Sequence, residues 1–105
     1  MKYVRTKDGR IGTGWEIASK PNVISFGQPH KFREQISKDD VLKQADTIEE
    51  LCDEFVVEDR DEFAIFHNLK LAKQTKGIIY GAIHIEDKGL IYVAKMNEKG
   101  EFELL

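Results

Sequence analysis

Hydrophobic and polar residues alternate most regularly in the last third of the chain. Three largely apolar runs, residues 78–86, 90–97 and 101–105, are separated by polar connections that end in Gly89 and Gly100. In both connections an acidic residue, a lysine and a glycine follow one another, which suits a type I turn followed by a glycine with positive φ. The pattern therefore predicts a three-stranded antiparallel meander.

The first two strands of this meander are apolar on both faces. Ile79 and Ile83 fall on one side of the first strand, and Ile78 and Tyr80 fall on the other. A sheet that is apolar on both faces has to be covered twice. We expect a helix on one face, and on the other either further strands of a curled sheet or a second copy of the chain, as a homodimer through the apolar sheet face.

A different periodicity occupies residues 46–57. Apolar residues at i, i+3, i+4 and i+7 predict an amphipathic helix of about three turns, and Thr47 followed by Glu50 is typical of a capping box at its start. The apolar stripe consists of Ile48, Leu51, Cys52 and Phe55, and the opposite, acidic face consists of Glu49, Glu50, Asp53 and Glu54.

The N-terminal half is less regular. Residues 3–6 and 10–17 predict a hairpin around Asp8-Gly9, with Ile11, Trp15 and Ile17 buried. Short strands are expected at 23–26 and 63–66. Residues 28–45 have no clear pattern, and we expect only that Ile36, Val41 and Leu42 point inward.

These elements predict one α+β domain over residues 1–105. It would be a small antiparallel sheet of about five to six strands, curled or partly open and barrel-like, with the amphipathic helix packed on it. A chain of 105 residues can bury a core without disulfides or a metal.

Charge is unevenly distributed within a net charge of −3. Residues 1–45 carry nine Lys/Arg against five Asp/Glu, whereas residues 46–62 carry nine Asp/Glu against Arg60 alone. The acidic helix face, Glu49, Glu50, Asp53 and Glu54, is therefore a candidate contact for a protein partner. A single cysteine, no apolar leader and no apolar run of about 18 residues favour a cytoplasmic protein without membrane contact.

Candidate catalytic and metal-binding groups do not form a recognisable set. Cys52 lies on the apolar stripe, where a core cysteine is expected, and burial there disfavours a thiolate. His30, His67 and His84 lack the spacing of metal ligands, and Gly12-Thr13-Gly14 lacks the remainder of a dinucleotide loop. We expect no catalytic residues, no metal and no cofactor, and thus a protein that is not an enzyme.

An alternative function is binding of single-stranded nucleic acid by the basic and aromatic N-terminal hairpin. Small barrels bind single strands by stacking bases on aromatic side chains in a basic groove. The candidate residues are Arg5, Lys7, Arg10 and Trp15. The acidic pI of about 5.6 makes nucleic acid the less favoured partner.

Residues 2–9, 43–56, 80–83 and 88–105 resemble stretches of small proteins from phages and prophages of low-GC Gram-positive bacteria. The resemblance covers about half of the chain. It implies a phage or prophage accessory protein in the cytoplasm of a bacterial host, with a phage or host protein as partner. It implies no activity and no site residues.

Overall fold

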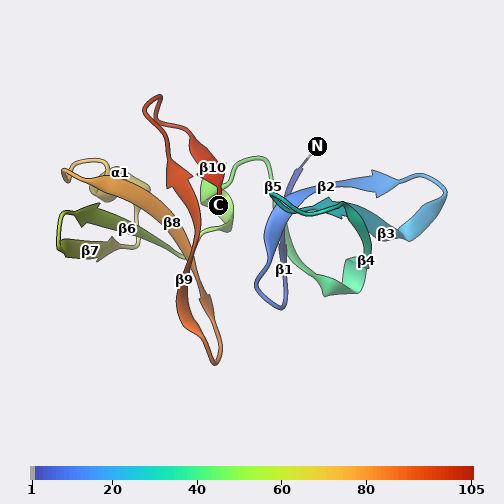
Figure 1. Cartoon of the computed structure of the whole chain (residues 1–105). Helices are drawn as coiled ribbons and strands as arrows, with labels where there is room; N and C mark the ends of the chain where they lie inside the picture. The colour runs from blue at the N-terminus through green and yellow to red at the C-terminus, as the bar shows by residue number, and fades with distance from the viewer. Residues whose placement is uncertain (1) are drawn as a thin grey trace. The chain divides into compact units, whose positions relative to one another are not determined.

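Ten β-strands make up most of the chain in the computed structural model, which describes residues 2–105 (Figure 1). They form two five-stranded antiparallel sheets, one in a unit that ends at Leu51 and one in the unit Cys52–Leu105. The antiparallel, β-rich architecture is confirmed, but a single sheet of five to six strands is wrong. Neither sheet closes into a barrel, since each strand order has two ends. The prediction of one domain over residues 1–105 stays a prediction.

The first unit has the strand order β4-β3-β2-β1-β5, so β1 lies between its hairpin partner and the last strand of the unit. Its core contains Val4, Ile24, Phe26 and Ile36, with Val41 packed against them. The strands are β1 (Lys2–Thr6), β2 (Ile11–Ile17), β3 (Lys20–Gly27), β4 (Glu34–Ser37) and β5 (Val41–Ala45), and the 3-10 turn η1 (Lys38–Asp40) precedes β5.

The inward face of β2 is formed by glycine. A Cβ atom on Gly14 would lie 2.7 Å from Val4 Cγ2 and 3.2 Å from Ile24 Cγ2, so these core side chains occupy the space that a side chain would need. Because side chains alternate along a strand, Trp15 then points outward, and its side chain is 46% exposed. The prediction that Trp15 is buried is therefore wrong, although Ile11 is buried as expected.

Within residues 28–45, which the sequence left open, a loop is followed by β4, η1 and β5 from residue 34 onward. Ile36 is buried and Val41 is half-buried, as predicted, but Leu42 is 55% exposed on the edge strand β5. Each of these strands contributes only one or two inward residues, which explains why no alternating pattern could be recognised.

The predicted three-turn helix over residues 46–57 does not form. The chain makes the 3-10 turn η2 (Glu49–Leu51) and then enters strand β6 at Glu54. Half of the capping box is present, because the Thr47 N–H donates to Glu50 Oε2 at 3.2 Å. Beyond this turn β7 and β8 pair with the two edges of β6, and the run from Phe55 to Val57 has the aromatic and β-branched residues that favour a strand.

The second unit has the strand order β10-β9-β8-β6-β7, and it contains the predicted C-terminal meander (Figure 1). Gly89 (φ +77°) and Gly100 (φ +82°) adopt the expected left-handed conformation. The strands are β6 (Glu54–Asp59), β7 (Glu62–Phe66), β8 (Ile78–Ile85), β9 (Gly89–Met96) and β10 (Phe102–Leu104), and the helix α1 (Leu69–Ala72) follows β7.

One face of this sheet is packed beneath α1. Phe55, Val57, Ile79 and Ala72 are buried together there, with Leu69 packed against them. The covering helix is thus four residues long and follows β7, instead of the amphipathic helix predicted before it. Within residues 2–105, no helix has the length and hydropathy needed to cross a membrane.

Candidate functional site

The four acidic residues predicted as a partner-binding helix face do not lie on a common helix. Glu49 and Glu50 lie on the turn η2 of the first unit, whereas Asp53 and Glu54 begin the second unit. The Asp53 carboxylate accepts a hydrogen bond from the His84 N–H at 2.8 Å. The helical spacing on which this contact was predicted is therefore wrong, and the partner contact itself stays a prediction.

Glu54 is the buried member of this set, with only 7% of its surface exposed. Its Oε1 lies 3.2 Å from His84 Nε2, within hydrogen-bonding distance. Its Oε2 lies 2.8 Å from His67 Nδ1, which is an ion-pair distance without hydrogen-bond alignment. A buried carboxylate needs such partners. The arrangement therefore fastens β6 to β8 and to the segment after β7, and both imidazoles are exposed at the surface.

Cys52 packs against the core of the second unit, close to β8. Its Sγ lies 2.6 Å from the position that a Cβ on Gly81 would take, so the sulfur fills the space beside this glycine. His30 belongs to the first unit, whereas the two histidines around Glu54 belong to the second. Among residues 2–105, no group of three or more His, Cys, Asp or Glu side chains has the geometry of a metal site.

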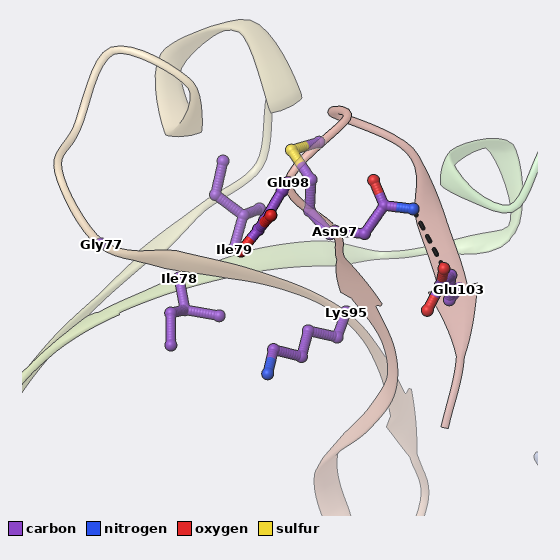
Figure 2. Close-up of a pocket in the computed structure, with 8 residues that line it drawn as sticks. Gly77, Ile78, Ile79, Lys95, Asn97, Glu98 and Glu103 are labelled. Atoms are coloured by element: carbon purple, nitrogen blue, oxygen red, sulfur yellow. Dashed lines mark hydrogen bonds between the residues drawn. The ribbon is translucent and has the colours of Figure 1, made fainter.

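A cavity of about 530 Å³ opens where β8 begins and β9 ends (Figure 2). Ile78 and Ile79 point to opposite sides of β8 there, and the Asn97 amide donates to Glu103 Oε1 at 3.0 Å. Lys95 lies on the side of Ile78. The lining combines two isoleucines with one lysine and two glutamates and contains no nucleophile beside a base, so it lacks the elements of an active site.

Two of the four candidate nucleic-acid-binding residues have structural partners. Arg5 Nη1 donates to the Leu51 carbonyl at 3.2 Å. Arg10 pairs with Asp8 at 3.1 Å and with Glu34 at 2.5 Å, and its guanidinium lies over the Phe26 ring. These contacts compete with phosphate for both guanidinium groups.

The other two candidates, Lys7 and Trp15, are exposed. Trp15 carries the guanidinium of Arg33 on its ring, with 3.7 Å from Cζ to the centroid. Arg33 also donates to Ser25 Oγ at 3.0 Å and to Thr13 Oγ1 at 3.1 Å, which holds the guanidinium across β2 and β3. A Cβ on Gly27 would lie 2.3 Å from Arg33 Nη1, so this glycine leaves room for the guanidinium.

The main exposed apolar surface of the second unit lies opposite α1. We call Phe63, Ile65 and Ile78 the outer apolar row, and their side chains are 65%, 48% and 46% exposed. Phe63 on β7 and Ile78 on β8 are both register partners of Glu58 on β6. The side chains of Phe63, Glu58 and Ile78 therefore follow one another across one face of the sheet.

Glu58 is the polar centre of this row. Its Oε1 accepts a hydrogen bond from the Tyr92 hydroxyl at 2.7 Å, and the Tyr92 ring stacks on Tyr80 with 4.9 Å between centroids. Burial, followed by the hydrogen bond to Glu58, raises the pKa of Tyr92 to about 12. The phenol thus remains a hydrogen-bond donor to the carboxylate throughout the neutral pH range.

Sequence reasoning did not single out the outer apolar row. The signal for Ile78 was present, because the meander was predicted to be apolar on both faces. Phe63 and Ile65 belong to a four-residue apolar run, in which alternation gives no indication of the exposed side.

Comparisons with known proteins found no match to a protein-family model, to a curated protein or to a solved structure. The resemblance to small phage proteins therefore remains a prediction from residues 2–9, 43–56, 80–83 and 88–105.

Proposed function

We propose that this chain is a non-enzymatic protein-interaction module that binds its partner through the outer apolar row of the second unit. The observation that carries the proposal is the exposure of Phe63, Ile65 and Ile78 on one sheet face. Single exposed hydrophobic residues are ordinary on protein surfaces, but neighbouring ones on a regular surface are typical of contact sites.

The rest of this face favours a specific contact. Tyr80 and Tyr92 stack beside the row, and Glu58 is held by the Tyr92 hydroxyl. Aromatic side chains that combine an apolar ring with a polar tip are common in interface cores. A partner that covers the row would find the central carboxylate already hydrogen-bonded.

Site-specific photocrosslinking in living cells tests this proposal without knowledge of the partner. Phe63 is replaced by a benzophenone-bearing amino acid, and covalent adducts are detected by their mass on a denaturing gel. We expect an adduct from position 63. The matched control is position 42 in the first unit, because Leu42 is also exposed but lies alone on β5.

The proposal is wrong if position 63 gives no more adduct than position 42. Mass spectrometry of the adduct distinguishes a second copy of the chain from another protein. We further propose, from the sequence resemblance, that such a partner belongs to a phage or to its bacterial host and that the chain acts in the cytoplasm as a phage accessory protein.

Nucleic-acid binding is the second candidate function, and it now rests on Trp15 and its neighbours. The observation in its favour is the stack of Arg33 on Trp15, together with Phe32, whose side chain is 98% exposed in the same loop as Arg33. Proteins that bind single strands usually stack the bases on aromatic side chains and contact the backbone with cationic ones. The ion pairs of Arg10 weigh against it.

Titration of the wild-type chain with oligothymidylate at low salt tests the second candidate. Binding over Trp15 would quench its fluorescence, weaken steeply as salt is added, and be reduced in the Arg33→Ala variant. Absence of quenching at low salt would exclude this function for the Trp15 surface.

A further inference from the structure

We propose that the partner at the outer apolar row is a second copy of this chain, which pairs its β7 antiparallel to β7 of the first around a two-fold axis at Ala64. This inference rests on the proposed function, because it names the occupant of the same surface. Three properties of β7 carry it: its free backbone edge, its side chains and its flanking charges.

The first property is the backbone. β7 is an end strand of its sheet and pairs only with β6, in the register Asp59↔Glu62 to Phe55↔Phe66. The hairpin turn between them has two residues, so Asp59↔Glu62 is the closing hydrogen-bonded pair, and hydrogen-bonded pairs recur at every second position. The N–H and C=O groups of Phe63 and Ile65 therefore point away from β6, toward the free edge.

The second property is that this edge is apolar. Of the four edge strands in residues 2–105, β10 has three residues, and β4 exposes Glu34, Gln35 and Ser37. On β5 a single large hydrophobic residue, Leu42, is exposed. On β7 both residues with free backbone groups also expose large apolar side chains, and the strand contains no proline and a single charged residue, Glu62, at its start.

A two-fold axis at Ala64 places the outward backbone groups of the two β7 strands opposite one another. Phe63 of each copy is then opposite Ile65 of the other, so the outward N–H and C=O groups of both residues pair across the interface. On the face opposite α1 the same register places each Phe63 ring beside an Ile65 side chain, which is a favourable cross-strand pair.

The third property is the charge at the two ends of β7. Residues 58–62, which end with the first residue of β7, contain four acids and Arg60, whereas residues 67–76 after the strand contain Lys70, Lys73 and Lys76 and no acid. Antiparallel pairing brings the acidic end of one strand to the basic end of the other, with Asp61 opposite His67. Parallel pairing would bring like charges together, so charge selects the antiparallel arrangement.

Cysteine crosslinking reads out this register directly. Ala64 of the two copies would form a non-hydrogen-bonded pair on the axis, with Cα atoms about 4.5 Å apart, which a disulfide can span. The test uses the full-length chain with Cys52→Ala, to remove the native thiol, and Ala64→Cys. We expect mild oxidation to convert most of the protein into a covalent dimer.

Glu62→Cys in the same background is the matched control, because Glu62 is also exposed on β7. In the proposed register the two Glu62 residues are four positions apart along the strands, about 13 Å, which is too far for a disulfide. Efficient crosslinking at 64 but not at 62 is the expected result. Equal crosslinking at both positions indicates random collision and overturns the pairing.

Light scattering on the wild-type chain provides a measurement that needs no cysteine variant. We expect a mass near twice 12.1 kDa that falls to 12.1 kDa in Phe63→Arg. A mass of 12.1 kDa at all concentrations, without crosslinking at 64, overturns the pairing with a second copy. If position 63 nevertheless photocrosslinks to a different protein, the proposed function stands and only its partner changes; if it gives no adduct, both fall.

Discussion

The two units have the same number of strands, but their outward side chains differ in the contacts that they make. In the first unit several outward charged and aromatic side chains contact one another: Arg10 pairs with Asp8 and Glu34, Lys38 pairs with Glu16, and Arg33 covers Trp15. In the second unit the outer apolar row is exposed on β7 and β8, which both pair with β6, and the outer edge of β7 is paired with no other strand of residues 2–105. The exposed apolar residues of the second unit's sheet share one face, whereas Phe32 and Leu42 of the first unit lie on a loop and on β5, and this difference supports the proposed contact on the second unit.

The largest expected effect separates the units by their cores. Phe26 is buried in the first unit, where Val4, Ile24 and Ile36 surround it. Phe26→Ala should lower the free energy of unfolding by about 3–5 kcal/mol, through lost burial and a cavity. Trp15, the single tryptophan, reports unfolding through its fluorescence, and we expect this transition to shift to a lower denaturant concentration. The rate of amide exchange in residues 52–105 should change little.

The matched variant in the second unit is Val57→Ala. It should speed amide exchange in residues 52–105 and leave the unfolding transition followed by Trp15 fluorescence nearly unchanged. If either variant shifts both units equally, the chain unfolds as the one cooperative domain that the sequence predicts, and the division into two stability units is wrong.

A smaller effect concerns Cys52 and Gly81 in the second unit. Gly81→Ala places a Cβ 2.6 Å from Cys52 Sγ and should cost about 1–3 kcal/mol by overpacking. In a Cys52→Ala background the sulfur is gone, and most of this loss should be recovered in a double-mutant cycle measured by denaturation. Additive effects of the two substitutions would show that Cys52 does not act through packing against Gly81.

Alkaline pH should weaken the second unit selectively. The pKa of Tyr92 is raised to about 12, so the folded chain favours the neutral phenol. Its contribution to stability is complete below the ordinary tyrosine pKa near 10 and is lost as pH rises from there through about 12. Tyr92→Phe should be less stable at neutral pH and show a flatter pH dependence in this range; an unchanged slope would contradict the assignment.

Acid should have the smallest effect, and it should act on the first unit. The hydrogen bond from the Thr6 hydroxyl, with Arg10 beside it, holds the pKa of Asp8 below its ordinary value. The stability that Asp8 contributes is therefore present above pH 4 and lost as pH falls below it. Asp8→Asn should remove less than about 1 kcal/mol at neutral pH, because the pair with Arg10 is largely exposed. Thermal melts of both chains at pH 3 and pH 7 measure the difference, which should be smaller at pH 3.

The sequence predicted buried positions better than it predicted the conformation that buries them. Ile48, Leu51 and Phe55 are buried as the stripe indicated. A helix was inferred because their spacing is helical, yet a 3-10 turn followed by a strand also turns all three inward. The decisive factor was not local, since β6 pairs with strands on both of its edges.

For Trp15 the strand was predicted correctly but the burial was not, because large aromatic residues in a strand are expected to be buried. Here the inward face of β2 belongs to Gly12 and Gly14, where the missing side chains leave room for the Gly27 backbone and for the side chains of Val4 and Ile24. Only the sheet register identifies which face this is. The outer apolar row could not be predicted for the same reason, since Phe63 and Ile78 are neighbours only through their common partner Glu58.

Amide hydrogen exchange at Phe63 and Ile65, measured over a dilution series, is the most direct test of the contact surface. If β7 pairs with β7 of a second copy, both amides are protected at high concentration and lose protection together on dilution, while the Val57 amide in β6 remains unchanged. If both amides exchange at the same fast rate at every concentration, the edge of β7 is open to water and pairing between copies is contradicted.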